Sequence, residues 1–350
     1  MKKLDLLLTL GTLFAGLALL LWGPRIQINT EFSARYIEGE IVDEHEEIFV
    51  VNVEGEELLA DPGIGGELYA LGDNVVLSVY ENPVSGELNY VINDQVRRPA
   101  IFAAAVLFLI LVVTVAGWQG FRALLGMAFS FVVLIRLVLP LLLGSITPFF
   151  SIFLGALLIL PVLFYLSHGV SKKTTVAMLS TLLTLVMTSV LVLIFTNWAN
   201  LTGTSSEEAG FLLLGSLGGQ IDFKVILLTG ILLSLIGVLD DVCLSQASLV
   251  QELKAAKSKD LFKSAMTVGR DHIASLVNTL ILVYAGAALP LILLFFEYQE
   301  PFLQIMNFEF MAEEILRTLL ASMGLVLAVP ITTFLALLWL PEDASSHTCR

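Results

Sequence analysis

The sequence is poor in charge, in cysteine and in basic residues, and each shortage excludes a class of protein. Charged residues make up 14% of the 350 residues against 57% hydrophobic ones, which is too little polar surface for a soluble protein of this length. The two cysteines, Cys243 and Cys349, form neither a metal-type spacing nor a disulfide framework. Lys and Arg number 18 against 32 Asp and Glu, so the basic footprint of a nucleic-acid-binding protein is missing.

What the chain has instead is a series of apolar runs near the roughly 20 residues that cross a bilayer. The first, from Leu6 to Trp22, follows a basic start, and we interpret it as an uncleaved helix because Leu-Trp-Gly-Pro is a poor signal-peptide cleavage site. The other runs cover residues 100–117, 123–143, 147–167, 174–196, 223–240, 272–296 and 315–339. We therefore expect an α-helical polytopic membrane protein with about eight transmembrane helices. Residues 1–23 would form the first, and residues 99–340 a seven-helix membrane domain.

Residues 24–98 differ from the rest because they hold half of the acidic residues. Sixteen of the 32 Asp and Glu lie between Glu31 and Asp94. Val50–Val53 and Val75–Val79 have the β-branched composition of short strands. We expect a small all-β domain of roughly five strands, either a barrel or a sandwich, with a structural or docking role.

The placement of Lys and Arg predicts the orientation of the spans. With the N-terminus in the cytoplasm, eleven of these residues fall in cytoplasmic segments and five outside. We expect a multi-pass protein of the cell (plasma or inner) membrane with both termini cytoplasmic, residues 24–98 extracytoplasmic and residues 341–350 as a cytoplasmic tail.

Residues 246–268 combine apolar positions with basic ones, and they contain no helix breaker before Lys254. This pattern predicts a cytoplasmic amphipathic helix along the membrane surface, because lysines on such a helix meet anionic lipid headgroups. The lysines concerned are Lys254, Lys257, Lys259 and Lys263. A solvated loop is the alternative.

Polar side chains gather where the sixth and seventh predicted spans reach the cytoplasmic surface. Two sets with helical spacing each share one face of a helix: Ser234, Asp241, Ser245 and Ser248, and then Asp271, Ser275 and Asn278. Ionisable residues in such places are rare and usually functional. We expect the two stripes to face one another and to line a substrate or ion pathway. Its candidate residues are Asp240, Asp241, Ser245, Gln246, Ser248, Asp271, His272, Ser275 and Asn278.

The chemistry of this set is rich in oxygen and includes one imidazole. Adjacent Asp240 and Asp241 suit proton carriage, because two like charges in a buried place compete for ionisation. Carboxylate oxygens also suit hard cations such as Mg²⁺, Ca²⁺ or Mn²⁺, and the identity of any metal stays open. The alternative is structural: the aspartates cap or solvate a helix end, and Arg270 pairs with Asp271. No nucleophile and base stand at a credible spacing, so we expect neither an enzyme nor a cofactor.

A few polar residues lie deeper in the predicted spans. Arg136 falls inside the third span, where a charge is costly unless it snorkels or is paired, for instance with an acid at the start of the eighth span. Glu313 and Arg317 have the i,i+4 spacing of a helical ion pair. We interpret Arg136, Glu313 and Arg317 as structural charges. Three threonines on one face of the fifth span favour helix packing over a pathway lining. They are Thr181, Thr184 and Thr188.

Two long motifs resemble the signature of the YibE/F family of bacterial membrane proteins. They are Gly237-Val-Leu-Asp-Asp-Val-Cys-Leu-Ser-Gln-Ala-Ser248 and Gly269-Arg-Asp-His-Ile-Ala-Ser-Leu-Val-Asn278, and Gly324–Thr333 is similar to that family as well. The resemblance is strongest over residues 224–340. It implies a polytopic inner- or plasma-membrane protein with an N-terminal extracytoplasmic domain and a permease-like role. Many members carry Asn where this chain has Asp240, so the resemblance favours Asp241 as the working carboxylate.

We therefore expect an ion-coupled permease or exporter, with Asp241 as the proton or cation site and an unknown substrate. The alternative is a non-transporting assembly or scaffold subunit that acts through its extracytoplasmic domain. The expected partners are the lipid bilayer and either a second copy or a related membrane subunit, and not nucleic acid.

Overall fold

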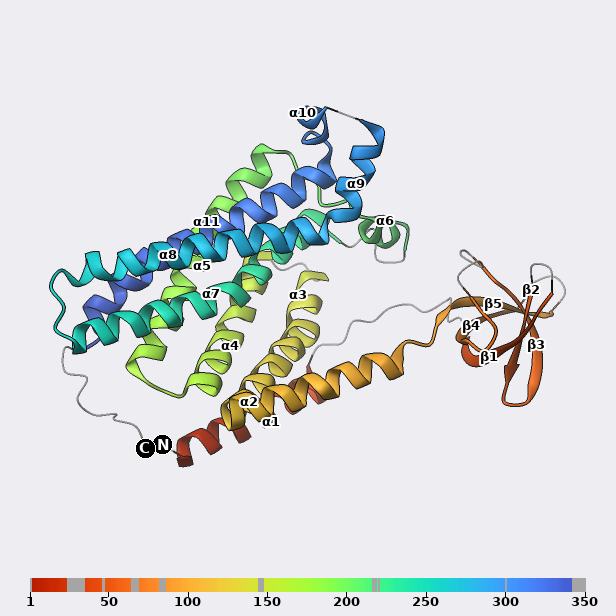
Figure 1. The fold of residues 1–350 in the computed structure, drawn as a ribbon, viewed down its shortest axis with the longest axis horizontal. Coiled ribbons are helices and arrows are strands. Elements are labelled where there is room, and N and C mark those ends of the chain that lie inside the picture. Colours follow the sequence, from red (N-terminus) through yellow and green to blue (C-terminus); the bar gives the residue numbers. More distant parts are fainter. Residues whose placement is uncertain are drawn as a thin grey trace. The chain divides into compact units, whose positions relative to one another are not determined.

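A bundle of apolar helices and a β-barrel make up the two units of this protein in the computed structural model (Figure 1). One unit is Ile28–Gly117, and the other joins Met1–Gln27 to Trp118–Arg350. The structure describes residues 2–23, 35–45, 48–63, 69–81, 86–143, 148–215, 219, 221–299 and 301–341. The first part of the predicted extracytoplasmic domain, residues 24–34, and the predicted tail from residue 342 lie outside the described residues.

The bounds of the elements follow the chain. The strands are β1 (Arg35–His45), β2 (Ile48–Val53), β3 (Glu56–Asp61), β4 (Asn74–Glu81) and β5 (Leu88–Gln95). The helices are α1 (Lys2–Trp22), α2 (Arg98–Val133), the π-helix η2 (Leu134–Val138), α3 (Leu139–Leu143), α4 (Pro148–His168), α5 (Lys172–Trp198), α6 (Glu207–Leu214), α7 (Phe223–Ala255), α8 (Leu261–Ala287), α9 (Leu289–Tyr298), α10 (Phe302–Ile305) and α11 (Glu309–Trp339).

The five strands close into a barrel in the order β1-β2-β3-β5-β4. Neighbouring strands are antiparallel except β3 and β5, which run parallel with Ala60 opposite Tyr90. Alternate side chains point inward, so Val51, Val75 and Leu77 are fully buried. A five-stranded Greek-key barrel is the architecture of the OB fold. The structure thus confirms the small five-stranded domain and selects a barrel over a sandwich.

Four helical stretches are long and apolar enough to cross a membrane: Arg98–Leu143, Lys172–Trp198, Phe223–Ala255 and Glu309–Trp339. A fifth is the broken pair Leu261–Ala287 and Leu289–Glu297, whose two parts are bent by 62°. Two of the remaining predicted spans correspond to shorter apolar helices, Leu7–Trp22 and Phe153–His168. The structure therefore supports a multispan helical protein with four or five long spans among its described residues, and the count of eight stays a prediction.

Arg98–Leu143 contains two of the predicted spans, residues 100–117 and 123–143. Its 46 residues are about twice the roughly 20 that cross a bilayer. The backbone of Gly117 interrupts it with φ 58° and ψ −142°, a conformation that side chains with a Cβ rarely adopt. This break lies at the end of the first predicted span, so the helix is divided where the sequence pattern predicts two separate spans.

The core of the helical unit lies where α5, α7 and α11 pack side by side, with α8 against α11 (Figure 1). Leu185, Leu235, Leu239 and Leu325 are fully buried at this centre. Gly324 of α11 lets the helices approach closely, because a Cβ there would lie 2.8 Å from Thr188 Oγ1. Small residues at helix contacts are the usual means of close packing between membrane helices.

The amphipathic helix predicted over residues 246–268 is wrong, because the chain reverses inside it. α7 ends at Ala255, and α8 begins only at Leu261. Lys257 and Asp260, with φ 51° and 53°, make the turn, and two left-handed residues end a helix even where composition favours it. Lys254 is buried and donates to carbonyl oxygens of α11, so it does not face lipid.

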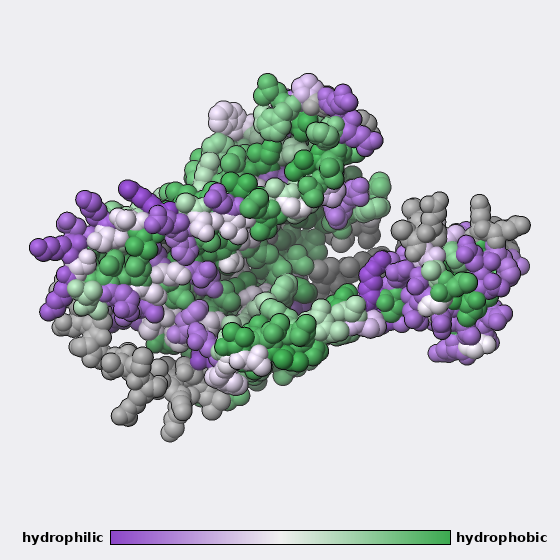
Figure 2. Space-filling model, in the orientation of Figure 1, coloured by the Kyte–Doolittle hydropathy of each residue, from purple (hydrophilic) through white to green (hydrophobic). Residues whose placement is uncertain are grey.

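The helices and the barrel have different surfaces (Figure 2). Apolar side chains cover much of the visible face of the helices, whereas the barrel is mostly hydrophilic. On the helical unit, hydrophilic residues gather around the end where α7 stops and α8 starts. An apolar belt with a polar end is the surface expected of a helix bundle that crosses a bilayer.

Candidate functional site

The candidate site is built on α7, which carries the aspartate pair. The helix starts at the Asp222 N-cap, whose carboxylate accepts from the Val225 amide, and it runs without a break to Ala255. Asp240 and Asp241 lie about 100° apart around this helix, so they meet different surroundings. Asp240 is half-buried, and its Oδ1 atom is buried without a hydrogen-bond partner among the described residues. Asp241 is exposed.

Next to Asp240 is a seam of buried hydroxyl and thiol groups between α5, α7 and α11. Cys243, one turn after Asp240, is fully buried, and the hydroxyls of Thr181 and Thr332 lie against its sulfur. Thr181 donates to the Ala177 carbonyl at 3.1 Å. The hydroxyls of Thr184 and Thr188, further along α5, are fully buried and have no hydrogen-bond partner among the described residues. The threonine face of α5 therefore packs inside the bundle, as its spacing predicts, and it brings polar atoms with it.

Asp241 is within electrostatic range of one basic residue of another helix, His168. The His168 imidazole, at the end of α4, is within electrostatic range of Asp241, Lys173 and Arg122. Arg122 is buried and donates to the Tyr165 carbonyl at 3.3 Å, which fixes it against α4. Neither His168 nor Arg122 is among the candidate site residues predicted from the sequence. The one sequence signal for His168 is its position at the end of an apolar run.

Gln246 is the polar residue of the motif that the structure buries most completely. Its side-chain Nε2 donates to Thr333 Oγ1 of α11 at 2.8 Å and to the Ala265 carbonyl of α8 at 3.2 Å. Gly269 of α8 lies next to it, and a Cβ there would be 2.5 Å from Val329 Cγ1. Gln246 and Gly269 therefore hold three helices together, which is a packing role for two motif residues.

The two predicted polar stripes do not face one another within one chain. On α8 the bundle contacts are made by Gly269 and Leu280, which are buried, whereas Asp271, Ser275 and Asn278 lie on the opposite side and are exposed. His272 is half-buried on the flank between the two sides. On α7, Ser245 is exposed like Asp241, and Ser248 donates to the Leu244 carbonyl of its own helix. Equal spacing shows that residues share a face, and the tertiary contacts decide which way that face points.

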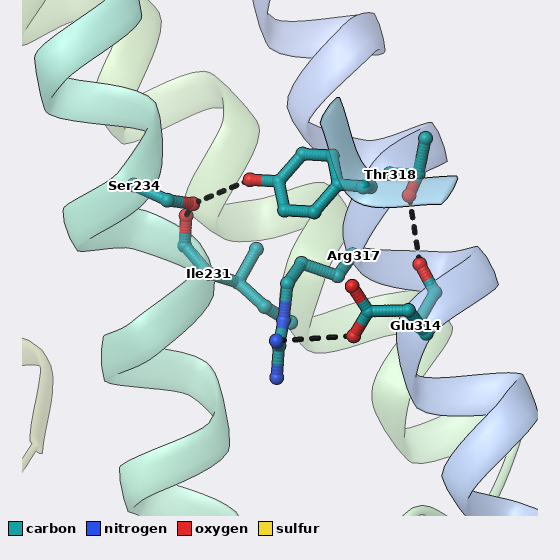
Figure 3. Close-up of polar contacts among 6 residues, drawn as sticks. Ile231, Ser234, Glu314, Arg317 and Thr318 are labelled. Atoms are coloured by element: carbon teal, nitrogen blue, oxygen red, sulfur yellow. Dashed lines mark hydrogen bonds and ion pairs between the residues drawn. The ribbon is translucent and has the colours of Figure 1, made fainter. Parts of the chain in front are cut away.

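Two further sets of polar contacts lie among α7, α8 and α11 (Figure 3). The hydroxyl of Tyr284 donates to Ser234 Oγ at 3.1 Å, and Ser234 in turn donates to the Ile231 carbonyl. Arg317 pairs with Glu314 at 3.1 Å on α11 (Figure 3). The predicted Glu313–Arg317 pair is wrong. Arg317 pairs instead with Glu314, three residues before it, and Glu313 is buried.

Arg136 and Glu313 lie in surroundings that the sequence does not indicate. Arg136 lies on the π-helix η2 and donates to the carbonyl oxygen of Leu20 at the end of α1. It is therefore bonded to a helix end and does not pair with the acids of α11. Glu313 is buried and lies beside Ser205 and Glu309. Among the residues that the structure describes, no three His, Cys, Asp or Glu side chains are grouped to hold a metal ion.

Apolar helices of spanning length, with charged and amide side chains enclosed between them, define a multipass membrane protein. The chain belongs to the YibE/F-like protein family, whose pattern matches residues 104–342. The match includes both long motifs and all of α4 to α11, and it leaves out the β-barrel. No curated protein and no solved structure matches the chain.

Proposed function

We propose that this protein is an ion-coupled permease or exporter whose coupling ion, a proton or a small cation, binds at the aspartate pair of α7. The observation that carries the proposal is the buried Oδ1 atom of Asp240, which has no hydrogen-bond partner among the described residues. A carboxyl group in the apolar part of a membrane protein is costly, and it is usually retained for function. An oxygen without a protein partner is free to hold a proton or a cation.

The different surroundings of the two aspartates support a relay. Asp241 is exposed within electrostatic range of His168, so it is open to water at one end of the bundle. Asp240, the next residue, carries the ion toward the buried seam that includes Thr181 and Thr332. Further along the seam, the Thr184 and Thr188 hydroxyls have no hydrogen-bond partner among the described residues, and such groups can pass on a proton or complete the ligands of a cation. The sequence favours Asp241 alone as the ion site. Because Asp240 is partly buried, we propose that both aspartates bind the ion.

The excess of Lys and Arg in the expected cytoplasmic segments supports an orientation for this relay. We place both termini and the turn between α7 and α8 in the cytoplasm, and the barrel outside the cell or inner membrane. His168 and Asp241 then lie at the cytoplasmic end of the bundle.

The test compares the metal and metabolite contents of cells with and without this protein, and then the same difference with single variants. We expect Asp240→Asn to abolish the difference and Asp241→Asn to reduce it, because each removes one ionisable group of the relay. Asp260→Asn is the matched control: it is the same chemical change at an exposed turn residue, and Asn tolerates the left-handed conformation there. Normal transport by a membrane-inserted Asp240→Asn variant would contradict the proposal.

A non-transporting assembly subunit is the second candidate. The observation that favours it is the barrel, a unit with its own core that the family match does not include. Deletion of residues 35–95, with the helices kept, separates the two functions. A phenotype that follows the barrel and is indifferent to Asp240→Asn would favour the assembly role.

A further inference from the structure

The outward face of α8 carries a polar stripe that none of the residues described by the structure covers. Asp271, Ser275, Asn278 and Leu282 follow one another at spacings of four, three and four residues, and all four are exposed. They lie on the side of the helix opposite to Gly269 and Leu280, which face α7 and α11. The side chains of Asp271, Ser275 and Asn278 make no hydrogen bond or ion pair with any residue that the structure describes.

This stripe runs into the apolar part of the span. α8 and α9 together are apolar enough to cross a bilayer as a broken helix. Asn278 is eight residues from Arg270, or about 12 Å at 1.5 Å per residue, and so lies near the middle of a core that is about 30 Å thick. Lipid tails offer no hydrogen bonds to a carboxamide, whereas Asn and Ser side chains bond readily across helix pairs. A protein helix is therefore the cover that this face needs.

We infer that α8 is the contact face of a homodimer, in which two copies of the chain pack α8 against α8 about a two-fold axis. A symmetric interface needs a patch that complements itself. Asn278 meets this need because its amide both donates and accepts, and the Ser275 hydroxyl does the same. Arg270 on the flank of the stripe balances the charge of Asp271 in the second copy.

The spacing also fits helix pairing. Alternating steps of four and three residues form the narrow seam of a left-handed helix pair, and a single buried Asn in such a seam fixes register and the number of helices. Exposed Ala274 beside the seam lets the backbones approach. The apolar Leu282 extends the seam beyond the polar residues, as expected of a helix contact inside a bilayer.

The experiment uses the purified full-length protein in lipid vesicles, with Cys349→Ser to remove the tail thiol. A cysteine at Asn278 or Leu282 is expected to cross-link oxidatively into a species of twice the mass. A cysteine at Val190 is the control, because this residue is also exposed, on the apolar face of α5. Equal cross-linking at Val190 and Asn278, or none at either seam position, would overturn the inference.

A second measurement does not depend on cysteines. Subunits are counted by stepwise photobleaching of the labelled protein at decreasing density in the vesicles. Asn278→Leu is expected to lower dimer association about tenfold, the order of one interhelical polar contact, and Asn278→Gln, which keeps the amide, to preserve most of it. A protein that is monomeric at all densities, or a dimer that is indifferent to Asn278→Leu, would refute the α8 contact.

Discussion

The Lys254 ammonium lies 2.6 Å from the carbonyl oxygen of Leu340 and thereby joins the end of α7 to the end of α11. It also donates to the Leu337 carbonyl at 2.7 Å. The last carbonyls of a helix have no partners within it and carry a partial negative charge, so a cation is well suited to them. A lysine expected to meet lipid headgroups instead fastens two core helices at the end where the chain turns.

Replacing Lys254 by Met tests this role. The variant keeps most of the apolar stem and removes the donor from one buried and one partly buried carbonyl, so we expect a loss of about 1–3 kcal/mol in the free energy of unfolding. The measurement is the thermal unfolding midpoint in detergent. Lys259→Met is the control, because Lys259 is exposed in the turn. If the two variants unfold at the same temperature, the two carbonyl contacts contribute nothing.

Gly269→Ala tests the close approach of α8 to α7 and α11. The added methyl would lie 2.5 Å from Val329 Cγ1 and 3.2 Å from the Gln246 amide, so the helices must separate. We expect a destabilisation of about 1–3 kcal/mol, as for other overpacked cores. The readout is again the unfolding midpoint in detergent.

Gly286→Ala supplies the control in the same helix, since a Cβ at Gly286 meets nothing within 4 Å. It is expected to be neutral or slightly stabilising, because Ala favours helix over Gly. The double variant Gly269→Ala with Val329→Ala should recover part of the loss. A Gly269→Ala protein as stable as Gly286→Ala would show that the helices do not approach as described.

The hydrogen bond between Tyr284 and Ser234 joins α8 to α7 and can be measured by a double-mutant cycle. Tyr284→Phe and Ser234→Ala each remove one side of the contact at 3.1 Å without changing its apolar packing. Cycles of this kind between membrane helices give about 0.6 kcal/mol on average, and we expect a coupling of that order. A coupling indistinguishable from zero would mean that the two hydroxyls act independently.

Much of the architecture follows from the sequence, because apolar length and β-branched alternation are local properties. The five-stranded domain and the long spans belong to this part. The direction in which a polar face points is not local: Asp271 and Gln246 are both motif residues, yet one is exposed and the other buried. The partner of Arg317 depended on rotamer geometry, since Glu313 and Glu314 are both within reach of it on a helix. His168 comes within electrostatic range of Asp241 only through the packing of α4 against α7.

The ion pair between Asp94, near the end of β5, and Arg97, just after that strand, predicts a pH dependence for the barrel. Arg97 Nη1 lies 2.6 Å from Asp94 Oδ2, and the Gln95 amide donates to Asp94 Oδ1 at 2.8 Å. Both contacts favour the ionised carboxylate and hold the pKa of Asp94 below its ordinary value. The Arg97 guanidinium has the larger effect, and the hydrogen bond from the Gln95 amide has the smaller one. A folded-state pKa below the unfolded one means that the pair stabilises the barrel at pH values above the unfolded pKa of about 3.9.

This contribution is lost as the pH falls through the lowered pKa of Asp94, where the folded carboxyl takes up its proton. The pKa is read from the carbon-13 shift of the Asp94 carboxyl during a titration of the labelled full-length protein in micelles. Arg97→Gln should raise the midpoint toward the ordinary value, and added salt should raise it in the parent protein because both side chains are exposed. A midpoint that stays at the ordinary value in the parent protein would show that the pair is absent in solution. We therefore expect an Asp94→Asn variant to be less stable than the parent protein at neutral pH. This difference in stability should shrink as the pH falls.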